Sequence, residues 1–234
     1  VKAAEQTRVE YSRGRLSIKT PKPRTLFGRG GSVDVAIELP TGSTLNGTAA
    51  VVEFESTGEL GECKLAMGSG DIRLDRTGSL NLKTGNGDVT VDHIAGDVNI
   101  TTGSGDVHVG EVTGSGSVKN ASGDTRIDKA GGELRVKAAS GDISVGLSGA
   151  AVDAKTASGD ISVGEAADGE VAIDTASGDL EVGIREGTAA WLNLRSLSGK
   201  VRNSLETADG PELSDATVKV RARTLSGDIT IRRS

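Results

Sequence analysis

The chain has 234 residues, a formal net charge of −6 at pH 7 and only 2% aromatic residues. Its 34 glycines and its small aliphatic side chains favour many short strands over helices packed on large side chains. The acidic balance argues against a protein that wraps nucleic acid over its whole surface, so we expect no nucleic-acid partner.

The N-terminal segment is basic, because residues 1–31 hold eight Lys and Arg side chains against two Glu. Within it, residues 21–31 combine basic, apolar and glycine residues, and this basic loop is defined by Lys22, Arg24, Leu26, Phe27 and Arg29. A solvated hairpin is the simplest interpretation. The alternative is a partner-binding loop that docks on an acidic protein, on another copy of the chain or, weakly, on an anionic membrane surface.

An alternating pattern follows, with Val33, Val35, Ile37 and Leu39 on one side of residues 33–39 and a Pro-Thr-Gly turn after them. It predicts a strand, and we expect residues 1–60 to form an irregular N-terminal β cap continuous with the next domain. No signal peptide or transmembrane segment is present, which slightly favours the cytoplasm. Because the chain starts at Val1 rather than Met, an envelope anchor before this residue stays an alternative.

From residue 61 onwards a Ser-Gly-Asp motif recurs with a period of 18 residues. The first and third residues after each Asp are usually apolar, as are two residues of a second short strand before the next motif. A weaker inward position, such as Ile94 or Val112, follows the Asp by six residues. The aspartates are Asp71, Asp88, Asp106, Asp124, Asp142, Asp160 and Asp179.

One such unit has too little apolar area to fold alone, but coils stacked at about 4.8 Å would pair every strand and seal a common core. The sequence therefore predicts an all-β chain whose residues 61–234 form a β-solenoid with about 18 residues per coil. Near the C-terminus Lys200 replaces the Asp, residues 205–217 have the composition of an inserted loop, and the pattern resumes at Asp228.

These repeats resemble a known bacterial family. The strand of residues 33–43 and the serial Thr-Gly-Ser-Gly-Asp-Val and Ala-Ser-Gly-Asp-Ile units are similar to the adhesin-like β-strand-repeat domain called the toast-rack domain. The resemblance covers most of the chain. It implies a β-solenoid and an association with the envelope or with envelope stress, and it supplies no catalytic residues.

Stacking in register would align the aspartates in a column, where like charges about 4.8 Å apart repel by roughly 0.9 kcal/mol in water. Two arrangements would offset this repulsion. Each carboxylate could accept hydrogen bonds from backbone N–H groups of its own turn, with Gly supplying a positive φ. Alternatively, a row of cations such as calcium could bind along Asp88, Asp106, Asp124, Asp142, Asp160 and Asp179, although the spacing differs from that of known calcium-binding rolls.

No catalytic or cofactor-binding constellation stands out. Cys63 falls on an inward strand position, which predicts a buried thiol rather than a nucleophile. His93 and His108 lie 15 residues apart, out of phase with the coil, so both are expected to be ordinary surface residues. The Gly-rich strings precede strands rather than helices, which argues against phosphate-binding loops.

The sequence therefore favours a non-enzymatic scaffold that binds proteins or assembles with itself, with no cofactor. A ligand or ion sensor at the cell envelope is the alternative. A carbohydrate-active β-helix enzyme is a more distant one, since the sequence lacks aromatic sugar-binding platforms.

Overall fold

The computed structural model describes residues 2–20, 33–205 and 216–234, and it divides into two compact units, Val1–Pro40 and Thr41–Ser234. The first unit holds a one-turn helix, α1 (Lys2–Glu5), and an antiparallel hairpin of β1 (Arg8–Ser12) and β2 (Arg15–Lys19). Its turn residues Arg13 and Gly14 both have positive φ, as a two-residue hairpin turn requires. Within the described residues, no helix is long and apolar enough to span a bilayer.

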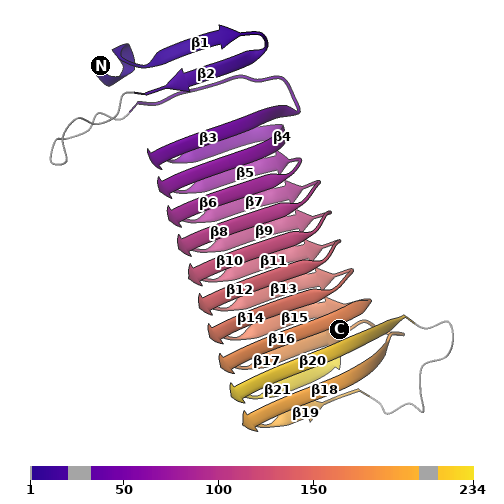
Figure 1. Ribbon diagram of the computed structural model, residues 1–234. Coiled ribbons are helices and arrows are strands. Elements are labelled where there is room, and N and C mark those ends of the chain that lie inside the picture. Colours follow the sequence, from indigo (N-terminus) through magenta and orange to yellow (C-terminus); the bar gives the residue numbers. More distant parts are fainter. Residues whose placement is uncertain (1, 21–32, 206–215) are drawn as a thin grey trace. The chain divides into compact units, whose positions relative to one another are not determined.

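The second unit is a β-solenoid of parallel strands, and each coil contributes one strand to each of two walls (Figure 1). Wall A begins with β3 (Ser43–Val51) and the second half of β4 (Phe54–Ser69), and it continues through β6 (Leu80–Asn86), β8 (Val98–Ser104), β10 (Gly116–Ser122), β12 (Leu134–Ser140), β14 (Val152–Ser158) and β16 (Gly169–Ser177).

Wall B begins with the first half of β4. It continues through β5 (Ile72–Thr77), β7 (Val89–Ile94), β9 (Val107–Val112), β11 (Thr125–Ala130), β13 (Ile143–Ser148), β15 (Ile161–Ala166) and β17 (Leu180–Ile184). The predicted period of about 18 residues per coil is confirmed, because residues 18 apart pair throughout the central coils, as Val107 does with Thr125.

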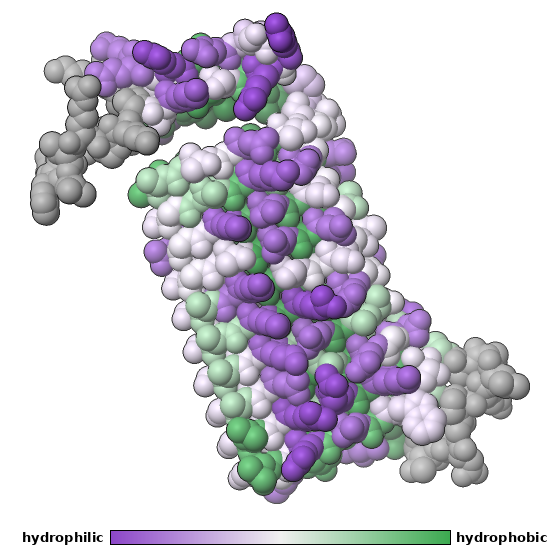
Figure 2. Space-filling view, viewed as in Figure 1, coloured by the Kyte–Doolittle hydropathy of each residue, from purple (hydrophilic) through white to green (hydrophobic). Residues whose placement is uncertain are grey.

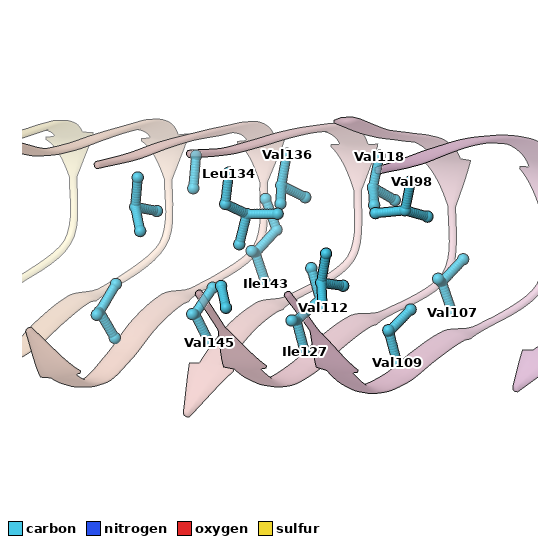
Figure 3. Packing of buried hydrophobic residues seen from close by; sticks show 14 of the residues in the cluster. Val98, Val107, Val109, Val112, Val118, Ile127, Leu134, Val136, Ile143 and Val145 are labelled. Carbon is cyan, nitrogen blue, oxygen red and sulfur yellow. The ribbon is translucent and has the colours of Figure 1, made fainter. Parts of the chain in front are cut away.

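The core lies between the two walls, where strand residues alternate between buried and exposed positions (Figure 3). The predicted inward residues are buried in both walls, among them Val98 and Ile100 in wall A and Val107 and Val109 in wall B. The weaker inward position is buried as well, as Ile94 and Val112 show. Residues that are distant in sequence thus share one continuous apolar interior, which a single coil could not form.

The last coils are out of sequence order. The chain leaves wall B after β17 and forms β18 (Ala189–Ser198) and β19 (Val201–Asn203), but neither strand pairs with β16 or β17. The C-terminal coil of β20 (Thr217–Ser226) and β21 (Ile229–Arg233) lies between them instead. In wall A the order is therefore β16, β20, β18, and in wall B it is β17, β21, β19 (Figure 1).

The N-terminal part differs from the sequence-based expectation. The predicted strand of residues 33–39 is wrong, because residues 33–40 belong to no strand of the structure, and Val35, Ile37 and Leu39 are exposed. Alternation alone does not make a strand without a hydrogen-bonded neighbour. The parallel pairing begins at Ser43, inside the segment that we expected to be a cap. Most of the inserted loop, residues 206–215, lies outside the described residues.

Candidate functional site

The aspartates of the Ser-Gly-Asp motifs form one hydrogen-bonded row along the corner between the walls. In each coil the Asp Oδ1 accepts a hydrogen bond from the backbone N–H of the Asp in the following coil, at 2.7 to 3.0 Å. This aspartate ladder consists of Asp71, Asp88, Asp106, Asp124, Asp142, Asp160, Asp179 and Asp228. The carboxylates do accept backbone N–H groups, as expected, but the donor belongs to the next coil rather than to the same turn.

The corner backbone explains why an Asp is needed. At the corner of Gly105 and Asp106, the N–H groups of Gly105 and Val107 donate to carbonyls of the following coil, whereas the N–H of Asp106 points to the preceding coil and meets the carboxylate of Asp88. Gly105 has a φ of +118°, and a Cβ there would lie 2.3 Å from the carbonyl oxygen of Gly87. Only glycine fits this turn.

The ladder ends at Lys200. Asp228 Oδ1 accepts the N–H of Lys200 at 2.8 Å, and Asp228 Oδ2 pairs with Arg202 at 2.9 Å. The hydrogen bond from the Lys200 N–H, together with Arg202, lowers the pKa of the Asp228 carboxyl. Because Lys200 has no carboxylate to offer a further coil, the coil of β18 and β19 fits the end of the stack, and the Asp228 coil fits its interior.

A second row, which the sequence analysis missed, lies on the inner side of the same corner. Its members are buried and donate to corner carbonyls: Thr175 Oγ1 donates to Gly159 at 3.2 Å and Thr224 Oγ1 to Gly178 at 3.1 Å. Asn120 does the same with its Nδ2, to Gly105 at 3.1 Å and Gly123 at 3.0 Å. This polar inner row is Thr84, Thr102, Asn120, Thr156, Thr175 and Thr224. The 18-residue steps from Thr84 to Thr102 and from Thr102 to Asn120 could have revealed it.

The two histidines pair with carboxylates of the next coil on wall B. His108 Nε2 lies 3.0 Å from Asp128 Oδ2, and His93 Nδ1 lies 3.5 Å from Glu111 Oε2. Hydrogen bonding from His108, then Arg126, lowers the pKa of Asp128, and Lys129 is the main cause of the lowered pKa of Glu111. The side chains of His93 and His108 both reach solvent, which fits the expected surface role.

An open hollow on wall B is lined by Asp75, Arg76, Asp92, His93 and Glu111. It brings three carboxylates and an imidazole near one another, but over the described ranges no group of three or more His, Cys, Asp or Glu side chains has the geometry to hold a metal ion. The cation row along the aspartate ladder, which the sequence offered only as the alternative, stays a hypothesis.

Cys63 lies on the inward side of β4, paired in register with Leu80, and is fully buried. Desolvation by burial raises the pKa of its thiol, while a hydrogen bond with Thr77 partly opposes this. The predicted buried thiol is confirmed. The basic loop of Lys22, Arg24, Leu26, Phe27 and Arg29 lies outside the described residues.

Exposed cations occur on both walls, and wall A groups several of them in one column. One outward column holds Lys119, Lys137 and Lys155 on consecutive strands, and after Asp174 it continues with Arg223 and Arg195 at the C-terminal end. A hydrophilic stripe runs down this face, and hydrophobic surface gathers at the lower left, where β18 and β20 end (Figure 2). The outward column of wall A is thus mostly basic, whereas the aspartate ladder at the corner between the walls is acidic.

The model of one protein family matches residues 2–232, and its description is Toastrack DUF4097. The chain belongs to the Toastrack family. No curated protein and no solved structure matches it. The Toastrack match agrees with the resemblance in the repeats, and it describes a repeat scaffold of unknown function.

Proposed function

We propose that this Toastrack chain is a non-enzymatic, adhesin-like scaffold that acts through protein binding or self-assembly. The observation that supports this proposal is the open end of its stack. Among the described strands, β18 pairs only with β20 and β19 pairs only with β21, so each has one unpaired edge. An unpaired parallel edge presents backbone donors and acceptors to any strand that approaches it.

The end coil also leaves part of the core uncovered. Leu192 and Leu194 of β18 are only partly buried, whereas Val220 and Ala222, their register partners in β20, are buried. No Pro interrupts the described part of this edge. Because edge strands of monomeric proteins are usually blocked by Pro, bulges or inward charges, this edge favours assembly with a second copy.

The mass of the chain in solution tests this proposal. We expect light scattering after size-exclusion chromatography to show a mass that rises above the 23.8 kDa of one chain as concentration increases. Leu194→Lys places a charge at the uncovered end of the core and should return the mass to that of one chain. Ala139→Lys, on the exposed corner of wall A, is the matched control and should assemble normally. A native chain that stays monomeric at high concentration would argue against self-assembly.

A further inference from the structure

The outward face of the two end strands of wall A is cationic and apolar at once. Residues of β18 and β20 alternate in and out, and their outward positions pair across the strands, Trp191 with Lys219 and Arg195 with Arg223. Neither β18 nor β20, both described over their full length, contains an acidic residue. This C-terminal patch consists of the cations Arg195, Lys219, Arg221 and Arg223 and the apolar residues Trp191, Leu197 and Leu225.

The cations of the patch lack the ion-pair partners that several other cations of wall A have. Lys64, Arg135 and Lys155 of wall A each pair with a carboxylate, at 2.7, 2.6 and 3.2 Å for their shortest ion pairs. Within the described part of the chain, none of the four patch cations forms an ion pair. Asp174 on β16 is the register neighbour of Arg223, but its carboxylate pairs with Lys155.

Two features of the patch are energetically unfavourable when no ligand is bound to it. Arg195 and Arg223 are direct cross-strand neighbours, and like charges in such a pair destabilise a sheet. In addition, Arg221 Nε is buried and has no hydrogen-bond partner. An anion above the patch would relieve the repulsion between the two guanidinium groups.

The apolar residues of the patch indicate what kind of anion binds there. Trp191, Leu197 and Leu225 are 61%, 74% and 59% exposed, and Leu197 and Leu225 lie side by side at the ends of their strands. The hydrophobic surface at the lower left of Figure 2 lies at this end. Tryptophan and leucine beside Arg and Lys are the side chains that enter the headgroup region of a bilayer, where the rings and aliphatic groups lie below the phosphates that the cations bind.

We infer that the C-terminal patch is a docking surface for anionic lipid bilayers. The four cations bind phosphate headgroups, and Trp191 and the two leucines insert between them. This surface faces outward from wall A, so it is separate from the strand edge through which the proposed self-assembly would occur. The proposed self-assembly and the proposed bilayer docking can therefore fail independently of each other.

The test uses the fluorescence of Trp191, which is the only tryptophan in the chain. The full chain is titrated with vesicles of phosphatidylcholine and phosphatidylglycerol at 7:3, and with vesicles of phosphatidylcholine alone. We expect the anionic vesicles to shift the emission to shorter wavelength and to protect Trp191 from iodide, and neutral vesicles to do neither. High salt should weaken the binding.

Matched variants assign the binding to the patch. Arg195→Glu with Arg223→Glu should weaken sedimentation with anionic vesicles at least about 20-fold, at roughly fivefold for each basic residue removed. Lys119→Glu with Lys137→Glu makes the same charge change on the same column and should have a much smaller effect. Arg195→Gln with Arg223→Gln gives a milder version if the reversal unfolds the end coil.

Three results would overturn the inference. Trp191 emission that does not change with anionic vesicles excludes insertion. If the native chain and the Arg195 and Arg223 variants bound vesicles equally, another basic segment would be the membrane contact. A patch that binds polyglutamate but not anionic vesicles would indicate an acidic protein partner instead of a bilayer.

Discussion

Asp142 and Asp160 lie 18 residues apart in sequence, yet the backbone N–H of Asp160 donates a hydrogen bond to Asp142 Oδ1 at 2.8 Å. The N–H of Asp142 makes the same contact with Asp124 at 2.9 Å. Each Asp therefore joins its coil to the next one through its side chain and to the preceding one through its backbone. The ladder sets the register of the whole stack at one corner.

The first prediction separates the acceptor role of a ladder residue from its charge. Asp142→Ala removes the acceptor for the Asp160 N–H and should lower the free energy of unfolding by about 1–2 kcal/mol. Asp142→Asn keeps an Oδ1 acceptor and removes one charge from an acidic row, so it should cost much less or even stabilise the chain. Urea unfolding of both variants measures the difference, and equal losses would contradict the acceptor role.

The second prediction concerns the polar inner row. Asn120 donates to the carbonyls of Gly105 and Gly123, and its Oδ1 accepts the N–H of Ser122 at 3.1 Å. Asn120→Ala removes the side-chain partner of these part-buried groups and should cost about 2 kcal/mol in unfolding free energy.

Asn120→Thr is the control, because Thr102 and Thr156 occupy equivalent positions of other coils and bond to corner carbonyls. This variant should recover at least half of the loss in the same unfolding experiment. No recovery would mean that Asn120 acts through its shape rather than through its hydrogen bonds.

The third prediction is a stabilising change. Thr125 occupies an inward position between Val107 and Ile143, it is buried, and its Oγ1 has no hydrogen-bond partner. Thr125→Val replaces the hydroxyl by a methyl group of similar size. It should raise the free energy of unfolding by about 1 kcal/mol, because an unpaired buried hydroxyl carries a desolvation penalty. Thr125→Ser should be less stable than the native chain, and a destabilised Thr125→Val would contradict the assignment.

The fourth prediction follows from Asp128, whose pKa is lowered by its hydrogen bond with His108 and by Arg126. A carboxyl with a lowered folded pKa stabilises the protein above its unfolded pKa of about 3.9, and this contribution disappears as the pH falls through the folded value. The native chain should melt about 1–3 °C above Asp128→Asn at pH 5, and the gap should close by about pH 2.5.

Asp92→Asn provides the comparison for this measurement, because Asp92 forms no ion pair within the described ranges. Its melting temperature should differ little from that of the native chain at pH 5. A gap between native chain and Asp128→Asn that persists unchanged to pH 2.5 would show that the Asp128 contacts do not depend on its charge.

Much of the fold could be predicted because the 18-residue repeat shows which strand positions face the core of the solenoid. The positions after each Asp, such as Val107 and Val109, are buried as the alternation indicates, and Cys63 follows the same rule. The direction of the ladder bonds could not be predicted, because the hydrogen bond of an Asp at a turn is ordinarily local and only the stacked corner shows that the Asp N–H faces the preceding coil. The strand expected at residues 33–39 is absent because the alternating pattern is a local property of the sequence, whereas a strand also needs a hydrogen-bonded neighbour that the pattern does not supply.

The order of the last coils was also beyond the sequence-based prediction. A periodic pattern shows that the segments after Ala189 and after Thr217 both make coils, but it does not say which one touches β16. The one indication is Lys200, which has no carboxylate for a further coil, while Asp228 can serve as both acceptor and donor at its corner.

The most direct test of the stacked arrangement is a pair of engineered disulfides in a Cys63→Ala background. Ser226 lies between Ser177 and Ser198 in register, so Ser177→Cys with Ser226→Cys should form a disulfide readily. Ser177→Cys with Ser198→Cys should not, because two strand spacings of about 4.8 Å exceed the Cα separation of about 7 Å that a disulfide tolerates. Cross-linking of Ser177→Cys with Ser198→Cys alone would show that the coils follow sequence order and would contradict the ladder that ends at Lys200.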